Sequence, residues 1–468
     1  MEFFYHFFKT VDTHIKKVIK LIIINFDKRG MFLMKYAIGL DLGTSAVKGI
    51  LADENENIIK SAECKFTYSS PNPNEVISNP NDFLASCYEV LRTLSDSLPA
   101  DGELVAVCEA SASGNLLLLD ENNNPITPIY NWQDKRTTTE TADILGQELA
   151  DNIFNVVGWG CKTVMPLAVL CWLKVHEPET LKRASFITMS TEYLNYKLCN
   201  EWGVSPSAGT PFHLIEQETG KYYKPYLEKL EISEDMLPPV LPIGATIGTV
   251  TEDAAKLTGL PVGTPIKLGT FDHIAGGIGA GVTKPGQMLL SCGTSWVFFI
   301  PTEKRDISVK ARLLTDPFLS SFGGSWCCMK SLPSIAHNIN EYVYRYISSE
   351  KDCFTKLDEY CLAARSDANG LIIDPFVHPD SAPDLSSYDK TDIARAIMVG
   401  VSTKLKETFK ALENIGIFAK SIVMVGGPSR SKVWQSVIAE ITGVEVKPAN
   451  GAFTGALGAA KIAFGLKL

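Results

Sequence analysis

The chain contains the same short pattern twice: an apolar strand, a turn of glycine, threonine and serine, and a second apolar strand. Small or polar residues alternate with apolar ones in the first strand of the first copy, which is typical of a strand with one restricted face. The copies lie about 250 residues apart, and this repetition predicts a duplicated half-molecule whose two turns face one another. The turn residues are Gly43, Thr44, Ser45, Gly293, Thr294 and Ser295.

The first turn lies between a carboxylate and a lysine. Asp41 stands near the end of the first strand, and Lys48 stands near the start of the second. Backbone N–H groups and hydroxyls in such a turn can bind phosphate oxygens, while one or two carboxylates suffice for a hydrated Mg²⁺ ion. For either turn alone, an ordinary hairpin without a ligand remains the alternative.

Length and composition indicate two enzyme-sized lobes. A chain of 468 residues is long for one domain, and we expect an extension at 1–33 followed by lobes at 34–280 and 281–468. The net charge of −9 argues against a nucleic-acid partner, which would require a basic surface. The 11 cysteines form no CxxC pair, so neither a zinc cluster nor a disulfide framework is indicated, and we expect a cytoplasmic protein with reduced thiols.

The first 33 residues combine lysines with a short apolar run at 21–26. That run is too short to cross a bilayer, and no small-residue cleavage site follows it. We expect an extension from an upstream start site, disordered or weakly amphipathic, and no stable membrane association. An export signal and a membrane-surface helix are the alternatives.

The remaining pattern is that of an α/β protein. Strands are predicted at 36–68, 104–108 and 116–119, all within one mixed sheet, with a helix at 80–94 beginning after Asn79. The segment from 137 to 235 is mostly helical in pattern. Strands return at 248–250, 265–269, 288–300 and 421–425, and helices are predicted at 275–281, 392–415, 431–442 and 455–464.

Two clusters could carry chemistry on a sugar. Asp272 follows a strand and precedes a glycine-rich stretch, where a carboxylate in a closing cleft can take a proton from an attacking hydroxyl. A helix N-cap is the competing interpretation of Asp272. Trp132, Asp134 and Arg136 place an aromatic ring beside a carboxylate and a guanidinium, which could bind a sugar, although a solvated salt-bridged loop would have the same residues.

A third cluster could border a nucleotide. Gly426 and Gly427 follow a strand, and Ser431 begins the next helix, so a nucleotide could lie close to the backbone at a helix N-terminus. A plain strand-to-helix turn remains the alternative. The glycines of residues 276–281 do not match G-x-G-x-x-G, and no G-x-x-x-x-G-K-[ST] occurs in the chain, which argues against dinucleotide and P-loop folds.

Taken together, these motifs resemble those of the FGGY family of carbohydrate kinases, which includes xylulokinase, gluconokinase, glycerol kinase and fuculokinase. The resemblance runs from Tyr36 to Leu468 and implies two actin-like, ribonuclease-H-like α/β ATPase lobes with the active site in the cleft between them. It implies that Asp272 is the catalytic base, that Asp41 holds Mg²⁺, and that ATP is the phosphate donor. The implied sugar contacts are Trp132, Asp134 and Arg136, and the implied ATP contacts are Asp41, Gly43, Thr44, Ser45, Lys48, Gly293, Thr294, Ser295, Gly426, Gly427 and Ser431.

The chain also departs from the family pattern. Residues 112–115, Ala-Ser-Gly-Asn, replace the usual run before the sugar motif, so Asn115 becomes a candidate substrate contact and the pocket differs from that of a standard glycerol kinase or xylulokinase. Pro428, Val399 and Val169 are further departures, and none of them removes the catalytic aspartate.

We expect phosphoryl transfer from ATP to a hydroxyl of a small sugar, a ketopentose or deoxy-ketohexose such as xylulose or fuculose. A kinase for a polyol or aldonate, such as glycerol, erythritol or gluconate, and a non-catalytic sugar-binding regulatory homologue are the alternatives. A chaperone-type ATPase of the actin-like superfamily would need a peptide-binding domain, for which no residues are left. A homodimer remains open.

Overall fold

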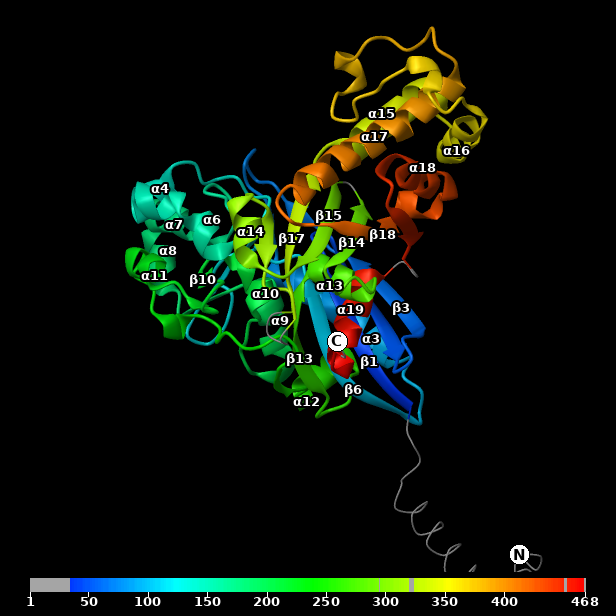
Figure 1. The fold of residues 1–468 in the computed structure, drawn as a ribbon. Coiled ribbons are helices and arrows are strands. Elements are labelled where there is room, and N and C mark those ends of the chain that lie inside the picture. The colour runs from blue at the N-terminus through cyan, green and yellow to red at the C-terminus, as the bar shows by residue number, and fades with distance from the viewer. Residues whose placement is uncertain (1–33, 294, 320–323, 450–452, 467–468) are drawn as a thin grey trace, which may run out of the picture.

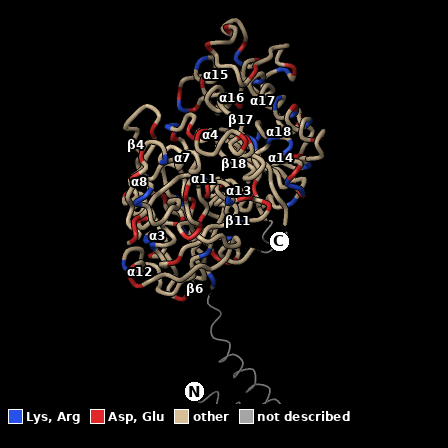
Figure 2. Tube along the Cα trace, turned by 90° about the vertical axis from the view of Figure 1, so that its left-hand side faces the viewer, with Lys and Arg blue, Asp and Glu red and all other residues tan. Residues whose placement is uncertain are grey.

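The computed structural model describes residues 34–293, 295–319, 324–449 and 453–466. The predicted extension at 1–33 and the predicted phosphate contact Thr294 lie outside the described residues. Among the described helices, none combines the length and apolar character that crossing a membrane requires. Figure 2 shows lysines and arginines scattered among acidic residues along the visible trace, rather than gathered into one stripe.

The first half of the chain builds a mixed six-stranded sheet (Figure 1). A central strand forms an antiparallel meander with the two strands that follow it and pairs in parallel with a third neighbour on its other side. The edge is completed by one further parallel strand and one antiparallel strand. In spatial order the strands are β12 (Thr246–Thr249), β13 (Pro265–Phe271), β6 (Gly102–Ser111), β1 (Met34–Leu42), β2 (Ala46–Asp53) and β3 (Ile58–Lys65).

The second half repeats this connectivity for five strands of a second six-stranded sheet, whereas its sixth strand pairs with the antiparallel meander and not with the outermost parallel strand. The hairpin of β14 and β15 corresponds to that of β1 and β2, and β14 again pairs in parallel with a strand on its other side. This shared order confirms the predicted duplication. In spatial order the strands are β16 (Leu314–Asp316), β17 (Trp326–Leu332), β15 (Trp296–Thr302), β14 (Gly286–Cys292), β18 (Ala419–Gly426) and β19 (Glu445–Pro448).

Two helices cross between the sheets (Figure 1). α13 (Asp272–Gly279) leaves the first sheet and packs against the second, where Gly277 lies against the ring of Phe299. α19 (Thr454–Phe464) leaves the second sheet and packs on β1, where Gly39 lies against the backbone of Ala456. Each half therefore supplies a helix that packs against the other half's sheet. One hydrophobic core contains residues of both halves, and each half also has a core of its own.

The predicted helical segment in the middle of the chain is confirmed. It contains α4 (Glu140–Leu145), α5 (Gln147–Asp151), α6 (Ile153–Val157), α7 (Pro166–His176), α8 (Pro178–Arg183), α9 (Ser190–Cys199), α10 (Pro206–Gly209) and α11 (Lys224–Leu230). The other α-helices of the described residues are α3 (Pro80–Ser95), α12 (Glu252–Thr258), α14 (Arg305–Lys310), α15 (Ile335–Tyr342), α16 (Cys353–Ala363), α17 (Lys390–Glu413) and α18 (Lys432–Thr442). As predicted, α3 begins after Asn79, whose side chain accepts from the backbone N–H of Asn81 at 2.8 Å.

One strand prediction was wrong in its placement. The run at 116–119 does form a strand, β7 (Leu117–Leu119), but it pairs with β9 (Phe186–Thr188) in a separate two-stranded sheet. The reason lies at Gly114, whose φ of 89° turns the chain away from β6. The remaining short strands are β4 (Tyr68–Ser69), β5 (Ile77–Ser78), β8 (Ile129–Tyr130), β10 (Ile215–Glu216) and β11 (Lys221–Tyr222).

Candidate active site

Two carboxylates from distant parts of the chain interact at the junction of the two halves. Asp41 lies near the end of β1, and Asp272 is the first residue of α13. Burial, together with the nearby Asp272, raises the pKa of Asp41 to about 7, and Lys48 acts in the opposite direction. Burial also raises the pKa of Asp272, against the effect of its neighbour His273. Both groups are thus poised to gain a proton or a cation more readily than ordinary aspartates.

Asp272 is not the N-cap that the competing interpretation required. The residue at the cap position of α13 is Phe271, and no side chain caps this helix. The Asp272 carboxylate accepts one hydrogen bond, from the backbone N–H of His273 at 2.6 Å. Its remaining acceptor capacity faces a cavity.

That cavity has a volume of about 340 Å³ and is lined by residues of both halves. Thr44, Trp132 and Asp272 come from the first half, and Ser295 comes from the second-half turn. The predicted base, one sugar-motif residue and one residue from each repeated turn are therefore brought together. No lysine or arginine is among the described residues that line the cavity.

Trp132 links the sugar motif to the first turn. Its indole Nε1 donates to Oγ1 of Thr44 at 3.0 Å, and 37% of the residue remains exposed. The indole is therefore held against the turn while part of it stays available to a ligand.

Asp134 and Arg136 are instead bound to each other. The guanidinium donates to both carboxylate oxygens, at 2.8 and 2.9 Å, and both side chains are nearly buried. The guanidinium also lies over the rings of Tyr130 and Trp172, at 4.6 and 4.9 Å from their centroids. This is a salt-bridged loop, as the competing interpretation held, but a buried one, and neither charged group is among the residues that line the cavity.

Asn115 also has a partner inside the protein. Its Oδ1 accepts from the backbone N–H of Ser190 at 2.7 Å, and the residue borders a small void next to the cavity rather than the cavity itself. The two voids share Thr44 and Ala112.

The second turn and the predicted nucleotide border lie side by side. Gly426 pairs with Cys292 across β18 and β14, and it has a φ of 96°. A Cβ on Gly426 would lie 2.4 Å from the carbonyl oxygen of Cys292, whereas one on Gly427 would meet nothing within 4 Å. The surface at Gly427, the residue that follows this pair, is therefore open.

Ser431 has a structural role in addition to its predicted one. Its hydroxyl accepts from the backbone N–H of Trp434 at 3.0 Å, which caps α18, and it donates to Asp358 at 2.9 Å. Both interactions use the hydroxyl, whereas the prediction placed the nucleotide against the backbone at the start of this helix.

Several residues that line the cavity were not predicted as contacts, and Ser113, Met165 and His213 are three of them. The hydroxyl of Ser113 and both ring nitrogens of His213 are buried without a hydrogen-bond partner. Met165 and His213 have positive φ values of 79° and 62°, which are rare for such residues and are concentrated at functional sites. The only sequence signal was the departure of residues 112–115 from the family pattern, and nothing in the sequence pointed to Met165 or His213.

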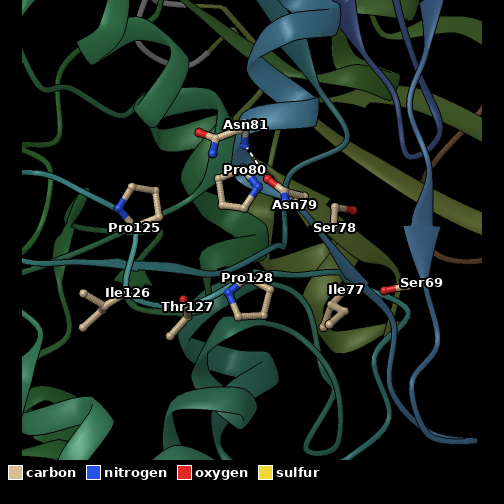
Figure 3. Close-up of a pocket in the computed structure, with 10 residues that line it drawn as sticks. All are labelled: Ser69, Ile77, Ser78, Asn79, Pro80, Asn81, Pro125, Ile126, Thr127 and Pro128. Carbon is tan, nitrogen blue, oxygen red and sulfur yellow. Dashed lines mark hydrogen bonds between the residues drawn. The ribbon is translucent and has the colours of Figure 1, made fainter.

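A larger hollow of about 570 Å³ lies beside the start of α3 (Figure 3). Prolines, asparagines and hydroxyl residues line it, and Asn79 there is occupied in capping α3. It contains no charged residue and none of the predicted site residues. The larger hollow therefore lacks the groups that phosphoryl transfer requires.

The residues around Asp41 fit a magnesium ion that is shared with a phosphate ligand. Within the described ranges, no group of three or more acidic, histidine or cysteine side chains could enclose a metal ion by itself. Mg²⁺ in nucleotide sites needs only one or two protein carboxylates, with phosphate and water completing its shell. Asp41, with Asp272 nearby and its pKa raised by burial, matches that requirement.

Comparisons with known proteins agree with this geometry. Models of the FGGY family of carbohydrate kinases match residues 36–279 as the N-terminal domain and residues 288–465 as the C-terminal domain. A xylulose kinase of Bacillus subtilis is 25% identical over 446 residues, which cover 92% of this chain and 88% of that protein.

Solved structures show the same fold. The structure of a xylulose kinase from Rhodospirillum rubrum has a TM-score of 0.83 at 24% identity, and it covers 92% of this chain and 91% of its own. The structure of a gluconate kinase from Lactobacillus acidophilus has a TM-score of 0.80 at 19% identity, with 93% and 90% covered. These likenesses support the predicted two-lobed actin-like fold. The chain belongs to the FGGY family of carbohydrate kinases, and it is a phosphotransferase that acts on a sugar hydroxyl.

Proposed function

We propose that this protein transfers the γ-phosphate of ATP to a hydroxyl of a small uncharged sugar, a ketopentose or deoxy-ketohexose. The observation that carries the proposal is the meeting of Asp272, Trp132 and the two repeated turns at one cavity. Its volume lies at the lower end of the range for small-molecule sites, about 300–1,000 Å³. A small sugar is the substrate size that this space favours.

In this proposal Asp272 accepts the proton of the attacking hydroxyl. A general base works best when its pKa approaches the operating pH, and burial shifts the pKa of Asp272 in that direction. The base lies in a cavity that both halves line, so closure of the halves would exclude water and align the reacting groups. Catalysis of phosphoryl transfer depends mainly on such positioning and on neutralisation of the charge on the transferred phosphoryl group.

The phosphates are proposed to lie between the two turns. Gly43, Thr44 and Ser45 would contact them from the first half, and Gly293 and Ser295 from the second. Lys48 would add positive charge, and Thr294 belongs to the same turn by sequence. When bound at Asp41, Mg²⁺ would neutralise charge on the phosphate oxygens.

The adenosine is proposed to lie over Gly427. The open space there and the close approach of Gly426 to β14 support this placement. Ser431 would act indirectly, by capping the helix that borders the nucleotide. Asp134 and Arg136 would likewise act indirectly, by holding the loop that carries Trp132.

The charge of the cavity favours an uncharged sugar over an aldonate. A carboxylate substrate is costly to desolvate unless a cation meets it, and no lysine or arginine lines the described cavity. The relatives named xylulose kinase support a ketopentose, whereas the likeness to the gluconate kinase structure shows the fold alone.

Magnesium-dependent ADP release across ketoses, aldoses, polyols and aldonates tests the proposal, with Asp272→Asn beside the parent. We expect one or a few uncharged sugars to stimulate the parent and the variant to lose about 10²–10⁴-fold in kcat with ATP binding retained. Asp253→Asn, at an exposed position of α12 that does not line the cavity, is the matched control and should match the parent. Undiminished turnover in Asp272→Asn would exclude Asp272 as the base. If no sugar of the panel stimulates ADP release although ATP still binds, the regulatory alternative is favoured.

A further inference from the structure

Two polar side chains of the cavity have no partner within the protein. The hydroxyl of Ser113 and both imidazole nitrogens of His213 are buried and make no hydrogen bond. Both residues line the same cavity as Asp272. A buried polar group without a partner costs about 1–3 kcal/mol, so folded proteins rarely retain one without a reason.

The two segments that carry Ser113 and His213 pack against each other. A Cβ on Gly114, directly after Ser113, would lie 3.1 Å from Cβ of Pro211, two residues before His213. It would also lie 2.8 Å from the sulfur of Met165. The turn after β6, the start of α7 and the end of the short helix at 210–212 therefore form one wall of the cavity.

His213 offers both kinds of hydrogen-bonding atom at once. Burial lowers its pKa to about 3, so the ring is neutral at physiological pH, with one N–H donor and one acceptor nitrogen. The serine hydroxyl can likewise donate and accept. A neutral pair of this kind matches hydroxyl groups, which also donate and accept, and offers no charge to a carboxylate.

We propose that Ser113 and His213 are the residues that select the sugar, by hydrogen bonding to its hydroxyl groups from the wall that also carries Met165. This rests on the proposed sugar-kinase function and names its substrate class as a neutral polyhydroxy compound. The unpaired atoms are shielded from solvent in the free chain, so binding requires the wall to adjust. The unbranched thioether of Met165 is the side chain best able to move.

The left-handed backbone at His213 guides the choice of variants. Its φ of 62° is tolerated by asparagine, which also keeps one donor group and one acceptor. His213→Asn is therefore the conservative variant and His213→Leu the disruptive one. Ser113→Ala removes the unpaired hydroxyl at nearly constant volume.

The assay measures KM and kcat for the best sugar of the panel, KM for ATP, and the urea midpoint of each variant. We expect Ser113→Ala and His213→Leu to raise the sugar KM about tenfold or more, with the KM for ATP unchanged and His213→Asn intermediate. The urea midpoint of Ser113→Ala should stay equal or rise, because an unsatisfied buried hydroxyl is removed. Thr302→Val, which removes another unpartnered buried hydroxyl away from the cavity, should leave both KM values unchanged.

Deoxy analogues of the best sugar sharpen the test. With the parent protein, one deoxy analogue should have a kcat/KM lower than that of the full sugar by about the same factor as Ser113→Ala or His213→Leu lowers the kcat/KM of the full sugar. The variant that matches this loss should then have the same kcat/KM for the deoxy analogue and for the full sugar. If a sugar is active but the Ser113 and His213 variants leave its KM unchanged, this inference is wrong and the kinase stands. If they lower stability and weaken both substrates alike, their role is structural and the inference also fails. If the parent is inactive on every sugar, the proposed function fails and takes this inference with it.

Discussion

The crossing of α13 and α19 makes a sharp prediction about stability. A Cβ on Gly279 would lie 1.9 Å from the carbonyl oxygen of Thr454, about 1.5 Å closer than the 3.4 Å at which ordinary contact begins. The obstacle is backbone, so it cannot turn aside, and the two helices would have to separate. Overpacking of this kind costs about 1–3 kcal/mol and occasionally more. We therefore expect Gly279→Ala to lower the free energy of unfolding by at least about 1 kcal/mol.

The same helix supplies the control. A Cβ on Gly276 would meet only a methyl of Leu289, at the ordinary distance of 3.8 Å. Gly276→Ala should leave the free energy of unfolding unchanged or raise it by up to about 1 kcal/mol, because alanine is the better helix former. Urea unfolding followed by far-UV circular dichroism measures both variants. Equal midpoints for the two would refute the close crossing.

Two further predictions concern charged groups. Asp134→Asn leaves Arg136 without its buried counterion, so the free energy of unfolding should fall by about 3–5 kcal/mol, as measured by urea denaturation. The pKa of Asp41 is about 7 in the folded chain and 3.8 in its unperturbed state, so the folded chain binds more protons between these values. Its contribution to stability should therefore be lost as pH rises from about 4 to about 7, and urea midpoints of the ligand-free parent and Asp41→Asn across this range should show a shallower fall for the variant.

Contrary outcomes are equally clear. A raised sugar KM with unchanged stability in Asp134→Asn would support direct sugar binding by this carboxylate and contradict the structural role. Parallel pH profiles for the parent and Asp41→Asn would mean that burial does not perturb this carboxyl group.

Local patterns in the sequence were sufficient to predict most elements. The strand pattern at β1, the cap at Asn79 and the helical stretch before His176 depend on neighbouring residues, and the strand, the cap and the helix were each confirmed. The strand at 116–119 was also recognised, but its partner was not. Pairing depends on where Gly114 sends the chain, and a positive φ cannot be read from a glycine alone.

The features of the candidate site likewise fall into those that the sequence predicted and those that only the tertiary structure showed. Short contiguous motifs in the sequence were sufficient to identify the two turns, to single out Asp41 and Asp272 separately, and to recognise the family, whereas the interaction between these two carboxylates was not predicted. Only the tertiary structure decided which side chains are free to meet a ligand. It placed Asp134 and Arg136 in a buried ion pair and left Ser113 and His213 unpaired at the cavity. Hydrogen-bond partners come from segments up to 196 residues apart, so their presence or absence is a property of the fold and not of any local pattern.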